Sequence, residues 1–403
     1  MVRWATEMVI RASVSLRGTA AALALTVQHL GLELATPAAT TVRSWLLRLG
    51  CFALTRPLPC DTPWLWLIDH TVQIGAVKLL VILGCPLSVV PFGERSLCLA
   101  DLQLLAVVPM EKSNGPAVAA ALEKTVVRTG VPRQIGSDQG TDLNAGVALF
   151  QQQHPGTAHV HDLAHQAANV LKHRWQKDER WSSLLQQLAQ TAAKVRQTRV
   201  AYLLPPTPRP KARFMNVGPV LRFAGRVLRL LDNPASSVAV TERYGWLREY
   251  RESVLGWTCE YEVVRIALQE VRQHGVGRES AAALDVAWAE LPWTPGARDV
   301  AARLRASVRR EGEQARSGER LVGSTEVLES AFGKLKRLEG SYAEDGFTGL
   351  VLSLGAITST WSEGEVREAL EAVPKKKAEG WVERVLGKSV QWFRRLFVEE
   401  TDV

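Results

Sequence analysis

The sequence is poor in cysteine, and its cysteines follow no recognisable spacing. Five are present among 403 residues, at positions 51, 60, 85, 98 and 259. An odd number without any Cys-x-x-Cys pair argues against a disulfide framework. Scattered thiols of this kind are typical of a protein in a reducing cytosol.

The chain also lacks a signal peptide, an internal repeat and a hydrophobic run long enough to cross a membrane. The most apolar stretch, residues 14–35, is interrupted by polar and charged side chains, which are Arg17, Gln28, His29 and Glu33. A spanning helix is therefore not expected. We predict a soluble cytoplasmic protein without a membrane partner, associated with the nucleoid if its source is prokaryotic.

Basic residues outnumber acidic ones, 49 to 41, which gives a net charge of +8. They gather in four places, residues 172–174, 209–213, 303–320 and 334–337. Patches of this kind indicate a polyanionic partner, and nucleic acid is the first expectation. The alternative is a basic surface that serves only solubility. The length suggests two or three domains.

Residues 64–161 contain the clearest alternation of strands and helices. Three apolar, β-branched runs at 64–75, 77–87 and 102–110 predict strands, and the first two are close enough for a hairpin. A helix at 114–130, a strand at 134–137, a helix at 142–153 and a strand at 157–161 complete the order βββαβαβ. This order predicts three antiparallel strands followed by parallel ones reached through helical crossovers.

Two carboxylates stand where buried strands end. Asp69 closes the first run, and Asp138 follows the fourth strand within 134-QIGSDQGTD-142. A charge beside a core costs several kcal/mol unless it is paired or binds a metal. Two such charges from distant segments therefore indicate one divalent-cation site and phosphoryl-transfer chemistry. Turn formation at Asp138 and solvation of Asp69 are the structural alternatives, and His70 is a neighbour within reach of a metal.

The flanking segments read as helical. Within residues 1–60, a helix over 37–50 capped by Thr40 or Thr41 puts Val42, Trp45, Leu46 and Leu49 on one face, with Arg43 and Arg48 elsewhere. Such a segment is either a helix-turn-helix DNA reader or an ordinary packed bundle. A further helical block, predicted at 175–204, 215–232, 244–273, 280–290 and 298–316, follows the fifth strand. It reads as an insertion rather than a separate domain.

A third carboxylate is expected on a helix against the sheet. Glu242, Glu249 and Glu252 are candidates, but Glu329 is preferred because it lies mid-helix among Leu328, Phe332 and Leu335. Glu326 belongs to the first turn of the same helix, which Ser324 or Thr325 would cap. Lys336 lies two turns beyond Glu329 on roughly the same face, where a lysine can contact a phosphate.

The strand order resembles the ribonuclease-H-like fold, in which the first and fourth strands each present one carboxylate. The motifs resemble those of DDE transposases of the insertion-sequence type, related to retroviral integrases. Ser137-Asp138-Gln139-Gly140-Thr141 is similar to the family's Ser-Asp-x-Gly-Thr stretch, and Ser324 with Glu329 and Lys336 is similar to its third-acid helix. Asp162-Leu163-Ala164-His165 resembles a signature found after the fifth strand in relatives with helical insertions.

The resemblance implies a two-metal DNA transposase. Asp69, Asp138 and Glu329 would be the catalytic and metal-binding residues, holding two Mg²⁺ or Mn²⁺ ions. Asp162 and His165 would support the site, and Lys334, Lys336, Arg337, Arg43 and Arg48 would bind DNA. The implied partners are transposon ends and target DNA, with a homodimer formed on them. The rivals are a ribonuclease-H-like nuclease that cuts without joining, and an inactive transposase-derived DNA-binding protein.

The predicted domains follow from this reading. Residues 1–60 form the helical N-terminal segment, 61–165 the first part of the catalytic core and 166–318 the all-helical insertion. Residues 319–355 return to the core with the third-acid helix, and 356–403 form a basic helical tail. The expected fold class is α/β, a ribonuclease-H-like mixed five-stranded sheet with a large helical insertion.

Overall fold

The computed structural model describes residues 1–74, 77–207, 213–233, 238–340 and 349–387. The chain divides into two compact units. The first, which we call the sheet unit, comprises Met1–Val160 and Thr325–Val403, and the second, which we call the helical unit, comprises His161–Ser324. The part of the predicted basic helical tail beyond residue 387 lies outside the described residues. No helix in the described ranges is long and apolar enough to cross a membrane.

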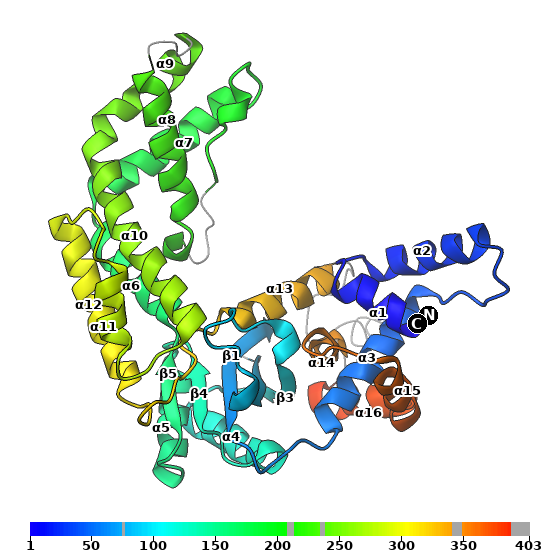
Figure 1. The fold of residues 1–403 in the computed structure, drawn as a ribbon. Coiled ribbons are helices and arrows are strands. Elements are labelled where there is room, and N and C mark those ends of the chain that lie inside the picture. The colour runs from blue at the N-terminus through cyan, green and yellow to red at the C-terminus, as the bar shows by residue number, and fades with distance from the viewer. Residues whose placement is uncertain (75–76, 208–212, 234–237, 341–348, 388–403) are drawn as a thin grey trace, which may run out of the picture. The chain divides into compact units, whose positions relative to one another are not determined.

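The sheet unit contains the five-stranded sheet in the order β3-β2-β1-β4-β5 (Figure 1). The strands are β1 (Trp64–Ile74), β2 (Val77–Pro86), β3 (Gln103–Met110), β4 (Gln134–Ser137) and β5 (Ala158–His161). β1 pairs with β2 antiparallel and with β4 parallel, and β2 pairs with β3 antiparallel. The predicted mixed sheet is therefore confirmed, and its strand order is that of the ribonuclease-H-like fold.

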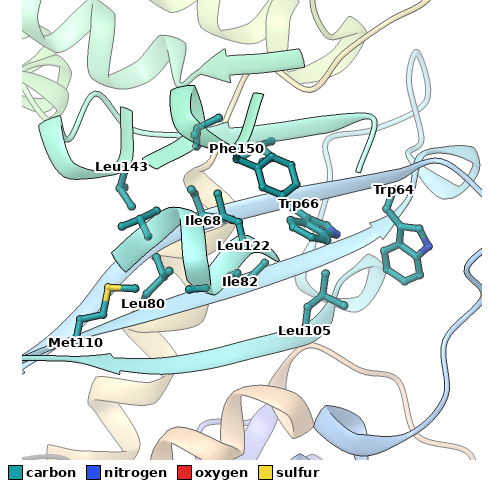
Figure 2. Packing of buried hydrophobic residues seen from close by; sticks show 14 residues of the cluster. Trp64, Trp66, Ile68, Leu80, Ile82, Leu105, Met110, Leu122, Leu143 and Phe150 are labelled. Atoms are coloured by element: carbon teal, nitrogen blue, oxygen red, sulfur yellow. The ribbon is translucent and has the colours of Figure 1, made fainter. Parts of the chain in front are cut away.

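One face of this sheet packs against the two crossover helices, α4 (Gly115–Thr129) and α5 (Thr141–Gln153). Alternate residues of each strand supply the core, because successive side chains of a strand point to opposite faces. Trp64, Trp66 and Ile68 of β1 belong to one cluster with Val118, Leu122, Leu143, Val147 and Phe150 of the two helices. Figure 2 shows the labelled members of this cluster between the strands and the helices.

The remaining helices of the sheet unit come from both ends of the chain. They are α1 (Val2–Ile10), α2 (Leu16–His29), α3 (Ala39–Thr55), α13 (Glu326–Gly340), α14 (Ser353–Ile357), α15 (Glu363–Ala372) and α16 (Lys375–Leu386). Short 3₁₀ turns lie at Leu87–Val89, Leu99–Asp101 and Gly349–Leu352. α3 packs against α2, α14, α15, α16 and β3, and α13 packs against β1. The two terminal segments therefore share one packed assembly.

The helical unit contains α6 (Leu163–Trp175), α7 (Glu179–Val195), α8 (Gly218–Asp232), α9 (Val238–Tyr244), α10 (Arg251–His274), α11 (Ser280–Ala287) and α12 (Pro295–Gly312). Three 3₁₀ turns lie at Ala201–Leu203, Arg213–Met215 and Gly245–Tyr250. α10 contacts α6, α8, α11 and α12 and is the central helix of this unit. Trp175, Trp181 and Trp257 form its aromatic core, with ring centroids 4.8 Å to 6.4 Å apart.

Candidate functional site at the ends of strands β1 and β4

Asp69 and Asp138 lie side by side where the pairing between the parallel strands β1 and β4 stops. Asp138 follows the end of β4, but β1 continues to Ile74 in its pairing with β2, so the prediction that Asp69 closes its strand is wrong. The last paired residues of β1 and β4 are Ile68 and Ser137, and each carboxylate comes one position later. Both side chains are half-buried. Strand pairing thus brings together two acids that are separated by a hairpin, a third strand and a crossover helix in the sequence.

Alternation along the strands places these acids on the face opposite α4 and α5. Asp69 follows Leu65 and Leu67, while the core-facing residues of β1 are Trp66 and Ile68. Asp138 comes two positions after Gly136, which lies next to Leu67: a Cβ added to Gly136 would be 2.8 Å from Leu67 Cδ2. The two carboxylates therefore share one face and one edge of the sheet.

Helix α13 begins on this same face. A Cβ on Gly136 would lie 3.6 Å from Thr325 Cγ2, and Thr325 directly precedes the first residue of α13. Glu326 in the first turn is half-buried, whereas Glu329 is exposed. The predicted third-acid helix thus starts next to β4, and of the two acids in its first turn Glu326 is nearer to the buried start of the helix.

Among the described residues, no three His, Cys, Asp or Glu side chains are arranged as a ready metal site. Asp69 and Asp138 are adjacent, but Glu329 does not join them in a three-residue cluster. The donor chemistry nevertheless fits, because adjacent carboxylate oxygens are the ligands that Mg²⁺ and Mn²⁺ prefer. The triad of Asp69, Asp138 and Glu329 stays a prediction.

Backbone amides orient both aspartates. Asp69 Oδ1 accepts a hydrogen bond from the amide of His70 (2.6 Å), and Asp138 Oδ1 accepts one from the amide of Gly140 (2.8 Å). Beneath Asp138, the Ser137 hydroxyl donates to the Asp138 carbonyl oxygen (2.8 Å) and contacts His159 Nε2 (2.8 Å). Ser137 is fully buried, so this contact fixes the turn that carries Asp138.

A second polar cluster lies beside the pair, on the α4 and α5 side of the sheet edge. Asp142 in the first turn of α5 accepts a hydrogen bond from the Ser113 hydroxyl (2.5 Å). It also forms an ion pair with Lys78 Nζ (3.4 Å). His70 Nε2 contacts the Ser113 hydroxyl (3.0 Å) and lies 3.9 Å from Asp142 Oδ2. The four side chains come from β1, β2, the β3–α4 connection and α5.

The electrostatics of this cluster are mutually dependent. Burial lowers the pKa of His70, and Lys78 lowers it further, while Asp142 and Asp138 oppose the shift. Burial acts to raise the pKa of Asp142, but the Ser113 hydrogen bond and the charges of His70 and Lys78 outweigh burial and lower it. Asp142 is therefore held as a carboxylate beside a largely neutral imidazole near neutral pH.

Sequence reasoning passed over Asp142, Lys78 and Ser113. A local signal for Asp142 existed, since it follows Asp138 by one helical turn and opens α5. Gly140 lies between the two acids: a Cβ there would be 3.0 Å from Asp138 Oδ1 and 3.3 Å from Asp142 Oδ1. Lys78 and Ser113 carry no local signal, because only strand pairing brings them to this edge.

The predicted supporting pair, Asp162 and His165, belongs to the helical unit. Asp162 caps α6, accepting a hydrogen bond from the Ala164 amide (3.0 Å), and its other oxygen lies 2.6 Å from His165 Nδ1. Asp162 is buried, and His165 keeps about a third of its side chain exposed. This contact holds the His165 ring in place, and a supporting role of the pair at the site stays a prediction. Glu249 is also in the helical unit, exposed, and its carbonyl accepts a hydrogen bond from Arg180 (2.6 Å).

Several predicted DNA-binding residues make contacts within the sheet unit. Lys334 donates to the carbonyl of Ile10 at the end of α1 (3.1 Å), and Arg337 donates to Ser13 (2.8 Å). Arg48 donates to the carbonyls of Val373 (2.7 Å) and Leu370 at the end of α15. These three side chains join helices together, a structural role in addition to any contact with DNA.

Lys336 and Arg43 complete the predicted set. Lys336 is exposed on α13, and Arg43 is half-buried on α3, where a Cβ on Gly349 would lie 3.5 Å from its Nη2. Because α3 is packed against helices from both ends of the chain, its surroundings are those of a core helix. The N-terminal segment is therefore packed into a helical bundle, and its DNA-binding role stays a prediction. Lys336 and Arg337 are the exposed members of the predicted DNA-binding set.

No protein-family model matches the chain, and no curated protein sequence matches it. Among solved structures, it is similar to the Drosophila P element transposase strand transfer complex, at 12% sequence identity and a TM-score of 0.41. The similarity covers 89% of this chain and 90% of that chain. The fold assignment rests on the strand order and register described above. The strand order and register define a protein with a ribonuclease-H-like sheet whose sequence is interrupted by a helical unit.

Proposed function

We propose that the protein is a DNA transposase that cuts transposon ends and joins the freed 3′-hydroxyl to target DNA. The observation that carries this proposal is the placement of Asp69 and Asp138 one position after the last residues that pair the parallel strands β1 and β4. Two adjacent, half-buried acids suit a cation site, because each acid would otherwise repel the other at a cost.

Asp69 and Asp138 would hold Mg²⁺ or Mn²⁺, with a third carboxylate supplied by α13. Bound ions would stabilise the attacking and leaving oxygens of an in-line displacement. Glu329 remains the predicted third acid, and Glu326 is now its first alternative. We favour Glu326 over Glu249 as the alternative third acid because Glu326 lies in the sheet unit, at the start of the helix that packs against β1.

The protein's own groups would position the site. The amides of His70 and Gly140 orient the two aspartates. Lys78 lies at the same edge through its ion pair with Asp142, where its positive charge favours a phosphate. Lys336 would contact DNA further along α13. The proposed partners are the two transposon ends and the target DNA, held by a homodimer.

The test is Mn²⁺-dependent nicking and joining of labelled duplexes that carry the element's own ends. Wild type is compared with Asp138→Asn and with Asp61→Asn, an exposed aspartate of the same unit, as the matched control. Joined product from wild type and the control but not from Asp138→Asn supports the proposal. Cutting without joining favours a nuclease, and binding without cutting favours an inactive DNA-binding protein.

The third acid is tested in the same assay with Glu329→Gln, Glu326→Gln and Glu249→Gln. We expect Glu329→Gln to abolish both reactions. If Glu326→Gln alone abolishes them, the acid lies one turn earlier on α13. If neither α13 variant does while Glu249→Gln does, the helix against β1 does not complete the site.

A further inference from the structure

The helical unit contains a basic groove between α8 and α10, away from the residues used above. The groove encloses about 340 Å³ and is lined by Arg222, Arg226, Arg229 and Arg251 together with apolar side chains of both helices. A volume of this size suits a small organic group such as one nucleotide. All of its lining residues belong to the helical unit.

Three of these arginines form a row on α8. Arg222, Arg226 and Arg229 are spaced four and three residues apart, so they share one helix face, and all three are exposed. Over the part of the chain that the structure describes, none of them makes an ion pair. Two arginines of α12, by contrast, are paired: Arg303 with Asp299 (3.1 Å) and Arg305 with Asp285 (2.8 Å).

An unpaired row of like charges at helical spacing is destabilising, so its presence indicates a polyanionic ligand. The row spans about 10 Å at 1.5 Å per residue, a length over which one nucleic-acid strand carries about three phosphates. An acidic residue in the lining, Glu262, does not cancel this charge, because it is paired with Arg265 (2.7 Å). Arg251 is paired with Asp232 (2.5 Å) at the end of α8.

The other wall of the groove is apolar and aromatic. Leu255 of α10 lines it while remaining 59% exposed, an unusual state for a leucine that faces a cavity. Tyr261 closes the groove toward the start of α8, where Gly218 gives it room: a Cβ on Gly218 would lie 2.2 Å from Tyr261 Oη. A row of cations facing apolar and aromatic surface is the arrangement by which proteins bind single-stranded nucleic acid.

We propose that the α8–α10 groove binds a segment of single-stranded DNA, with its phosphates on the three arginines and a base against Leu255 and Tyr261. The choice of DNA rests on the proposed function, whereas the groove and its charge do not. A duplex is too wide to place its bases in a cavity of this volume. An acidic peptide would satisfy the arginines but has no planar group for the apolar wall.

The test measures binding of a labelled oligothymidylate to the full-length protein by fluorescence anisotropy, with EDTA present and at several salt concentrations. The triple variant Arg222→Gln, Arg226→Gln, Arg229→Gln is compared with Lys194→Gln, Arg196→Gln, Arg199→Gln, which removes the same charge from exposed positions at and just after the end of α7. We expect the α8 variant to bind about tenfold or more weakly and its log–log salt slope to fall by about 2. The α7 variant should change far less.

A single substitution tests the apolar wall. Leu255→Gln should weaken oligothymidylate binding without changing the salt slope, and Leu230→Gln, an exposed leucine of α8 outside the lining, serves as its control. Equal losses in the two triple variants would overturn the groove. The α8 triple variant is also tested with duplex DNA and with polyglutamate. If it loses as much affinity for either of them as for oligothymidylate, the groove is not specific for single-stranded DNA.

Because divalent cation is absent, these readings do not depend on cleavage. If the groove variants bind oligothymidylate weakly while wild type never cuts DNA, the groove proposal is supported and the proposed transposase activity is wrong. If wild type cuts and joins while the α8 triple variant binds oligothymidylate normally, the enzyme stands and the groove falls.

Discussion

A buried acid in the helical unit and two acids in the sheet unit differ in the groups that surround them. In the helical unit, Glu260 is buried and accepts hydrogen bonds from Arg174 Nε and Nη2 (2.9 Å each) and Trp175 Nε1 (2.6 Å). In the sheet unit, Asp69 and Asp138 are half-buried and are oriented by backbone amides of nearby residues. In the first arrangement, a buried negative charge is neutralised by donors of the same unit. In the second, two negative charges lie next to each other on the same face of the sheet.

This difference separates a structural carboxylate from a candidate ligand-binding one. A buried acid surrounded by cationic and indole donors stabilises the packing around it. Asp69 and Asp138, beside one another on adjacent parallel strands, repel each other, and a bound cation would relieve that repulsion. Substitutions test this distinction: a ligand-binding acid should matter for activity, and a structural acid should matter for stability.

The largest expected effect is on activity at Asp138. Asp138→Asn keeps an oxygen that can accept from the Gly140 amide but removes the charge, so strand joining should fall at least about 100-fold, more than the loss of an outer-shell partner causes. The thermal midpoint should hold or rise, because the repulsion with Asp69 is relieved. Quantitative joining assays and calorimetry measure the two. A clear loss of stability would make Asp138 a structural residue like Glu260.

The opposite result is expected at Glu260. Glu260→Ala should lower the free energy of unfolding by about 3 kcal/mol, because it leaves Arg174 and the Trp175 indole without their shared acceptor. Glu252→Ala, at an exposed position on the same helix, should stay within about 0.5 kcal/mol of wild type. Urea denaturation followed by tryptophan fluorescence measures both. Equal stabilities for the two variants would contradict the structural role.

A smaller effect is expected from crowding the candidate site. Gly140→Ala would place a Cβ 3.0 Å from Asp138 Oδ1 and 3.3 Å from Asp142 Oδ1, so one carboxylate must move by a few tenths of an ångström. We expect about a tenfold loss of cleavage, since small misplacements of reacting groups are costly. Gly156→Ala, where nothing lies within 4 Å, is the control. Full activity of Gly140→Ala would show that Asp138 need not hold its position.

The smallest effect concerns the pH dependence of stability in the helical unit. Burial acts to raise the pKa of Glu311, but the hydrogen bond and charge of His161 outweigh it and hold that pKa below its ordinary 4.5. The resulting stabilisation is present above the unfolded-state pKa and lost as the pH falls through the folded one. Urea titrations from neutral to acidic pH should show Glu311→Gln losing less stability on acidification than wild type. A parallel loss in both proteins would exclude this source.

The core of the sheet unit was predictable because its signals are local. The β-branched runs, the Pro and Gly residues between them and the helix stripe of Val118 and Leu122 gave strands and helices that match the observed ones to within one or two residues. The five free cysteines also agree with the prediction of no disulfide framework. Strand pairing rules then placed Asp69 and Asp138 next to each other.

Predictions in the helical unit were less accurate at the ends of helices. One helix was expected over 175–204, but α6 ends at Trp175 and α7 begins at Glu179. Asp178 causes the break, because its side chain caps α7 by accepting from the amides of Arg180 and Trp181. On α3, neither Thr40 nor Thr41 is the cap, since the helix begins at Ala39 after Ala38.

The sequence by itself determined the order of strands and helices along the sheet unit, the candidate acids Asp69 and Asp138, and the excess of positive charge. These follow from hydrophobic periodicity and from the high cost of an uncompensated charge beside a buried strand. Only the tertiary structure decided that Lys78, Ser113 and Asp142 meet His70, that Arg48 and Lys334 join helices, and that α8 and α10 enclose a basic groove. Each of these depends on contacts between residues far apart in the chain, and such contacts are set by packing, which no local pattern records.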